Sequence, residues 1–175
     1  MLAAARSGAP WAFERLYAEL SPQVANYLTL RGVTERDDVT SEVFLAVFQR
    51  LATFTGSEAK FRSWVFAIAH NKAADVHRRE TRRPWAEAGP DAVPERPGGN
   101  VEDEAMSSLA TQRVRRLLDT LPDLQREVLV LRIVADLTVE QVAAALGKSS
   151  GAIKQHQRRA LIQLREKLER EGVTL

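Results

Sequence analysis

The chain has 175 residues, of which 45% are hydrophobic and 27% charged, proportions that are ordinary for a folded protein with one average domain or two small ones. It contains no cysteine, which excludes disulfides, thiolate metal ligands and cysteine nucleophiles and suits the cytoplasm. No apolar run approaches the roughly 20 residues of a membrane-spanning helix, and the first residues lack the pattern of a signal peptide, so we expect no membrane insertion.

The first half of the chain has the periodicity of helices and no alternation of period two. Apolar side chains repeat at helical spacing over residues 13–20. A second helix is expected within residues 21–32. There Ser21 is a possible N-cap, Pro22 suits the first helical position and Gly32 can end the helix.

A third helix is expected within residues 34–54, because one apolar stripe runs along it. The stripe consists of Val43, Phe44, Val47, Phe48 and Leu51. Another set of side chains falls mostly off the stripe and is expected to face outward: Asp38, Ser41, Glu42, Leu45 and Gln49.

The segment "WVFAIAHNKAADVHRRETRRP", residues 64–84, predicts a fourth helix that begins apolar, carries polar groups in its middle and ends basic. Basic residues outnumber acidic ones over residues 60–83, and again over residues 148–170. Because the whole chain has a net charge of only +2, these two basic stretches suggest two contacts with a polyanion. Two ordinary solvated helix faces are the alternative.

Prolines and glycines concentrate between the two halves, in a stretch that is acidic toward its end and has almost no apolar periodicity. We therefore predict an all-α fold with two small helical domains joined by a flexible linker. The expected boundaries are 1–83 for the first domain, 84–106 for the linker and 107–175 for the second domain.

The segment "LTVEQVAAALGKSSGAIKQHQRRALIQL" predicts a helix-turn-helix in the second domain. Thr138 and Gln141 have the spacing of a capping box, and Gly147 can adopt the left-handed conformation that ends a helix. Ser149 or Ser150 then caps a second helix. A helical hairpin that only packs is the alternative.

The side chains near the start of this second helix are suited to the major groove, because they supply fork donors for guanine, an amide for adenine and positive charge for phosphates. They are Lys154, Gln155, His156, Arg158 and Arg159.

The chain resembles bacterial RNA polymerase sigma factors of the extracytoplasmic-function (ECF) type. In the first half the resemblance lies in "FERLYAELSPQVANYLTLRG", "RDDVTSEVFLAVFQRLATF" and "FRSWVFAIAHNKAADVHRR". In the second half it lies in "LPDLQREVLVLRIVADLTVEQVAAALGKSSGAIKQHQRRALIQLREKL". It implies a sigma-2 domain, a linker and a sigma-4 domain that contains the helix-turn-helix.

The resemblance also implies which residues bind. On the third helix, Asp38, Ser41, Glu42, Leu45 and Gln49 would contact the clamp helices of the polymerase β′ subunit. The minus-ten element would be contacted by Phe54, Asn71, Lys72, Asp75, Arg78 and Arg79, with Asn71 at the pocket for a flipped base. The minus-thirty-five element would be read by Lys154, Gln155, His156, Arg158 and Arg159, while this domain sits on the β flap.

The implied function is that of a sigma factor, which binds core RNA polymerase and promoter DNA, melts the DNA and starts transcription. We expect a cytoplasmic protein that is not an enzyme and needs no cofactor or metal, and an anti-sigma factor as a further partner. The acidic linker is expected to thread the RNA-exit path of the polymerase.

Two rival functions are weighed against this one. The first is a stand-alone helix-turn-helix regulator of transcription. The second is an enzyme built on histidine, since His70 and His77 could share a helix face, but no third ligand lies at metal-site spacing.

Overall fold

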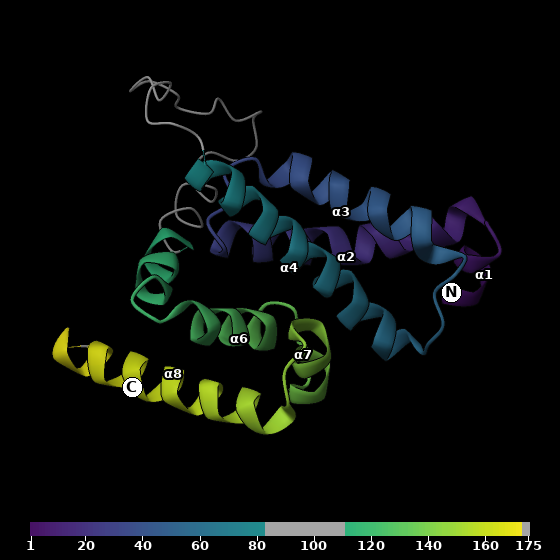
Figure 1. Ribbon diagram of the computed structural model, residues 1–175. Coiled ribbons are helices and arrows are strands. Elements are labelled where there is room, and N and C mark those ends of the chain that lie inside the picture. The colour runs from purple at the N-terminus through teal and green to yellow at the C-terminus, as the bar shows by residue number, and fades with distance from the viewer. Residues whose placement is uncertain (83–110, 173–175) are drawn as a thin grey trace, which may run out of the picture.

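The computed structural model describes residues 1–82 and 111–172 (Figure 1). Within the first range the helices are α1 (Leu2–Arg6), α2 (Pro10–Leu30), α3 (Arg36–Leu51) and α4 (Glu58–Arg82). Helices α2, α3 and α4 pack against one another, and α1 packs against α2. Fully buried side chains fill the space between them, among them Val24, Tyr27, Val43, Val65 and Phe66.

Helix α2 runs without interruption through residues that the sequence had divided between two helices. Pro22 was expected at the start of a second helix, but it lies inside α2, so this prediction was wrong. A proline in a helix leaves the carbonyl four residues earlier without its usual N–H partner. Both Pro22 and Ala18, which carries that carbonyl, are exposed, so water can satisfy it.

The apolar stripe of α3 was predicted almost correctly. Val43, Phe44, Val47 and Leu51 are buried, but Phe48 is 59% exposed. Phe48 lies at the edge of the stripe. Its ring packs edge to face against Phe13 of α2, with the ring centroids 5.0 Å apart, and the remainder of the Phe48 ring is in solvent.

Residues 111–172 form the second helical unit. The chain is helical at 111–118 and in α6 (Asp123–Ile133), α7 (Val139–Leu146) and α8 (Ser150–Arg170). Helices α6 and α7 both pack against α8. No strand occurs in either described range, so the all-α prediction is confirmed. None of the described helices is long and apolar enough to cross a membrane. The expected linker, 84–106, lies outside the described residues, and its boundaries stay predictions.

The helix-turn-helix forms where local signals predicted it. The Thr138 hydroxyl accepts a hydrogen bond from the backbone N–H of Gln141, and the Gln141 side chain accepts one from the backbone N–H of Thr138. Gly147 ends α7 with φ of 62°, in the left-handed region. Ser149 caps α8 by accepting from the backbone N–H of Ala152.

The two helical units contact each other through α7 on α4 and α6 on α2 (Figure 1). The contact includes the carboxylate of Glu127 on α6, whose side chain is only 3% exposed. Arg31 forms an ion pair with it at 2.8 Å, and His70 Nδ1 lies 3.0 Å from Glu127 Oε1. The Tyr27 hydroxyl donates to the same oxygen. Tyr27 of α2, Arg31 directly after α2 and His70 of α4 thus surround one buried charge of the other domain.

Two further hydrogen bonds cross the same boundary. The Arg62 guanidinium of α4 donates to the backbone carbonyl of Ala135 at 2.8 Å and also to the Gln23 side chain. Gln141 of the capping box donates through Nε2 to the carbonyl of Ala59 at 2.8 Å. A residue of the capping box at the start of α7 therefore also ties α7 to the beginning of α4.

The turn at Gly147 provides a test of the local fold. Replacing Gly147 with alanine places a Cβ in a left-handed conformation, so we expect the free energy of unfolding to fall by about 1 kcal/mol. Gly151 is the matched control, because it is helical and a Cβ there also meets no atom within 4 Å. Urea denaturation of both variants measures the effect, and equal stability of Gly147→Ala and Gly151→Ala would contradict it.

The contacts among Glu127, Arg31, His70 and Tyr27 lower the pKa of Glu127 and leave the pKa of Tyr27 raised. Burial alone would raise the pKa of Glu127, but the hydrogen bond with His70 and the positive charge of Arg31 outweigh burial and hold this pKa below its ordinary 4.5. Burial and the nearby Glu127 charge raise the pKa of Tyr27 well above its ordinary 10.0.

The stability of the fold should depend on pH accordingly. The lowered pKa of Glu127 contributes stability above pH 4.5, which is lost as pH falls through the folded-state pKa. The raised pKa of Tyr27 contributes stability below pH 10.0, which is lost as pH rises through its folded-state value. We expect chemical denaturation at a series of pH values to show both declines, and Glu127→Gln to remove much of the acid one. An unchanged acid decline in Glu127→Gln would refute this assignment.

Candidate nucleic-acid and polymerase interfaces

The outer face of α3 carries the side chains expected to meet polymerase. All five are exposed: Asp38, Ser41, Glu42, Leu45 and Gln49. Their spacing along α3 places them on one side of the helix, opposite the buried stripe. Leu45 is 58% exposed and stands among polar neighbours, the arrangement of an apolar interface centre with a polar rim. The Ser41 hydroxyl donates to the carbonyl of Asp37 at 3.0 Å, so its proton is already in use.

Two aromatic residues of α2, Phe13 and Tyr17, lie beside α3, and the helical spacing over residues 13–20 had already included them. Tyr17 contacts the ring of Phe44 at 4.7 Å, in the same way that Phe13 contacts Phe48. Tyr17 is 39% exposed and Phe48 is 59% exposed, so apolar surface beside α3 remains open to solvent. Position at the edge of the apolar stripe was the only sequence signal for Phe48.

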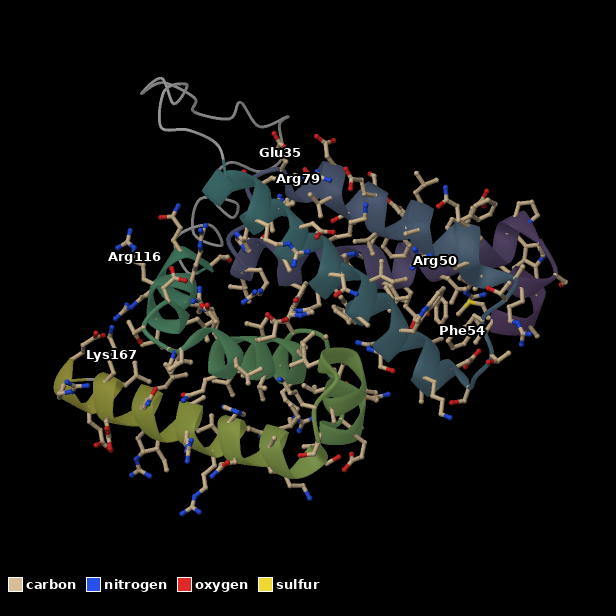
Figure 2. The ribbon with its side chains drawn as sticks, in the orientation of Figure 1. Glu35, Arg50, Phe54, Arg79, Arg116 and Lys167 are labelled. Carbon is tan, nitrogen blue, oxygen red and sulfur yellow. The ribbon has the colours of Figure 1, made fainter. Side chains whose placement is uncertain are left out.

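The expected minus-ten residues follow the outer side of α4. Asn71 is exposed and lies in the middle of the helix. Its side-chain amide therefore caps no helix end and forms no turn. Lys72 forms an ion pair with Glu42 of α3 at 2.7 Å, so the expected DNA and polymerase faces meet at this pair. Asp75 pairs with Arg78 one turn further along, and Arg79 is exposed near the end of the helix (Figure 2).

Phe54 lies before the start of α4, far from Arg79 at the other end of that helix (Figure 2). Only 9% of it is exposed. Its ring contacts Trp64 at 4.9 Å and Phe61 at 5.5 Å. In this conformation Phe54 therefore supports the first turns of α4 from inside and offers no open ring face.

The expected minus-thirty-five residues divide between two sides of α8. Four of them are exposed on one side: Lys154, Gln155, Arg158 and Arg159. His156 is half-buried and lies on the stripe that contains the buried Ile153 and Ala160. Its Nδ1 is buried and has no hydrogen-bond partner within the described residues. The ring of His156 thus packs toward the domain interior more than toward a ligand.

The other histidines do not form a metal site. His70 contacts Glu127, and His77 Nε2 donates to the backbone carbonyl of Arg31 at 2.9 Å. In residues 1–82 and 111–172 no group of three or more histidines and carboxylates is placed to hold a metal ion.

Known proteins identify both helical units. The sequence model of Sigma-70 region 2 matches residues 16–83, and that of Sigma-70, region 4 matches residues 117–166. The ECF RNA polymerase sigma factor ShbA of Streptomyces griseus is 40% identical over 132 residues, which cover 74% of this chain and 69% of ShbA. The ECF RNA polymerase sigma factor SigD of Mycobacterium tuberculosis is 34% identical over 180 residues, covering 98% and 84%. The chain belongs to the ECF sigma factor family.

The likeness of this sigma factor to solved structures extends over both units. The structure of CnrH in complex with the cytosolic domain of CnrY matches with a TM-score of 0.74 and 28% sequence identity, covering 96% of this chain and 94% of CnrH. The prediction of an ECF sigma factor is confirmed, and the stand-alone regulator is not supported.

The different burial of Phe54 and Asn71 predicts different consequences of mutation. Removing a buried aromatic ring costs about 3–5 kcal/mol, so Phe54→Ala should lower the free energy of unfolding by that order. Asn71→Ala changes an exposed side chain and should shift it by less than about 0.5 kcal/mol. Thermal and urea denaturation of both variants measures this, with Phe54→Leu as the control that retains burial. Equal stability of the two alanine variants would show that Phe54 does not support α4.

Proposed function

We propose that this sigma factor uses three separate faces, on α3, α4 and α8, to join core RNA polymerase to promoter DNA without catalysing a reaction itself. One observation carries the proposal, namely that the chain exposes three different surfaces. The face of α3 has an apolar residue at its centre, the face of α4 has the amide of Asn71 followed by basic residues, and the face of α8 is basic. A polymerase contact, a single-strand contact and a duplex contact require these three kinds of surface.

The α3 face is proposed to bind the β′ clamp helices. Leu45 would be the apolar centre, and Asp38, Glu42 and Gln49 would form a polar rim that excludes water and orients the contact. The exposed edge of Phe48 lies beside this face and enlarges its apolar part.

The α4 face is proposed to hold the melted minus-ten strand. An unpaired base exposes its Watson–Crick edge, which the amide of Asn71 can bind, while Arg79 is placed for phosphates further along. Phe54 contributes by holding the start of α4 in place. Because these groups favour the single strand over the duplex, binding shifts the equilibrium toward open DNA.

The α8 face is proposed to read the minus-thirty-five duplex. Lys154, Arg158 and Arg159 can donate to guanine edges or phosphates, and Gln155 can pair with adenine. His156 would contribute through packing, since its ring is half-buried.

A protein inhibitor is also proposed as a partner. CnrH is seen in complex with the cytosolic domain of CnrY, and the similarity to CnrH covers 96% of this chain. An anti-sigma factor that binds this chain would act in the cytoplasm, where we propose that the sigma factor works.

Transcription with purified core polymerase tests the assignment of the two DNA faces. We expect Asn71→Ala to lower initiation on duplex templates about tenfold and to recover on a template already melted at the minus-ten element, because the lost contact serves strand capture. Lys154→Ala should lower initiation on both templates, and only where a minus-thirty-five element is present. Arg50→Ala, an exposed change on α3 outside all three sets, is the control. Equal losses in both variants on every template would contradict separate readers.

A further inference from the structure

We infer that Lys72 is a positioning residue of the polymerase contact, rather than the DNA contact that the resemblance implied. Its ammonium holds the carboxylate of Glu42 in the orientation in which the α3 face meets core polymerase. The observation that carries the inference is the ion pair between Lys72 Nζ and Glu42 Oε2 at 2.7 Å. The inference rests on the proposed function, because it deepens the assignment of the α3 face.

Lys72 lies on the side of α4 that faces α3. It follows Val65 by seven residues, close to two helical turns, and Val65 is fully buried. Ile68, one turn before Lys72, is buried as well, and α3 packs against α4. Asn71 is rotated from Lys72 by about 100° around the helix axis and is exposed. The stem of Lys72 therefore lies toward α3, while the amide proposed for the melted strand lies on another side.

The environment of the ion pair suits a role in orientation. The side chain of Lys72 is 33% exposed and that of Glu42 is 49% exposed. An ion pair between two fully exposed side chains contributes little, because both lose conformational freedom when they meet. Packing already restricts the stem of Lys72, so less freedom is lost here. The result is a glutamate on the α3 face with one preferred orientation before any partner binds.

A fixed carboxylate is useful at this place on α3. Glu42 and Asp38 make the α3 face acidic around Leu45, so a complementary partner surface supplies cations or other hydrogen-bond donors. Lys72 binds Oε2 of Glu42, and the second oxygen, Oε1, can accept from such a donor at the same time. Ordering a long side chain during association weakens binding, so a glutamate ordered beforehand gives an affinity about threefold to tenfold higher.

The competing role for Lys72 is a contact with a DNA phosphate. Its ammonium would have to leave Glu42 for this contact, and the carboxylate would then lose its cation while a phosphate approaches. Two negative groups that share a site repel each other. The pair at 2.7 Å therefore favours the polymerase role, and the two roles predict different measurements.

Competition for purified core polymerase tests the affinity. The chain has no cysteine, so a fluorophore on Ala18→Cys, at an exposed site of α2, reports binding by anisotropy, and unlabelled variants displace it. We expect Lys72→Met, which retains the stem, to bind about threefold to tenfold more weakly, and Lys72→Arg to restore binding. Lys60→Met removes the same charge at an exposed site of α4 and should bind as the unaltered chain does. Unchanged or tighter binding of Lys72→Met overturns the inference.

A double-mutant cycle tests whether Lys72 acts through Glu42. Glu42→Gln should weaken binding to core polymerase, and adding Lys72→Met to it should cause no further loss. Additive losses would show that Lys72 acts elsewhere and would overturn the inference. Urea denaturation checks that each variant is folded. If Lys72→Met does not fold, Lys72→Gln takes its place in the same measurements.

A titration of transcription separates the polymerase role from the DNA role. The template is limiting and already melted at the minus-ten element, and the sigma factor is added to a fixed amount of core polymerase. We expect Lys72→Met to need about threefold to tenfold more protein for half-maximal initiation and to reach the same plateau. A lower plateau with an unchanged half-maximal concentration would identify a DNA contact and overturn the inference.

Leu45→Ala separates failure of the inference from failure of the proposed function. Weaker binding of Leu45→Ala and Glu42→Gln to core polymerase, with full binding of Lys72→Met, overturns only the role of Lys72. Full binding of Leu45→Ala and Glu42→Gln would show that α3 does not contact polymerase, and the proposed function of this face would fail with the inference.

Discussion

The carboxylate of Glu127 is the group on which the arrangement of the two domains depends. A buried carboxylate without partners is unstable, because no other group replaces the water it has lost. Arg31, His70 and Tyr27 replace that water, and all three belong to the other domain. Neither domain can therefore satisfy this group by itself. This site is specified by charge and hydrogen bonding, which have direction, and so it selects one relative orientation of α6 and α2.

This constraint explains why α4 has three different kinds of side chain. One side of the helix carries Val65 and Phe66 into the core of the first domain. A second side carries Arg62 and His70 to the second domain. The remaining side carries Asn71 and the basic end, which is the side that we propose for the contact with DNA. A helix that packs into a core on one side and against a second domain on another has few positions that tolerate change.

Local signals predicted the elements well, and contacts between distant residues were not predictable in this way. The capping box at Thr138 and the turn at Gly147 act over a few residues, so the sequence alone located the helix-turn-helix. The helix start predicted at Pro22 was wrong because an exposed proline can be accommodated within a helix. The predicted burial of Phe48 was wrong because a side chain at the edge of an apolar stripe can point toward the core or toward solvent. Tyr27 and Glu127 are 100 residues apart, and no periodicity links them. The outward residues of α3 and the α8 residues followed from pattern, whereas the α4 residues and the partners of all three faces came from resemblance.

The polar groups of the domain contact give it a direction that burial of apolar side chains alone does not provide. An apolar contact would gain stability with every methylene group removed from water, and opening it would expose that whole surface. The contact around Glu127 is built instead from an ion pair, a histidine and a phenol. Such groups specify one geometry for this part of the contact, because a hydrogen bond or an ion pair weakens when its partners are turned away from each other.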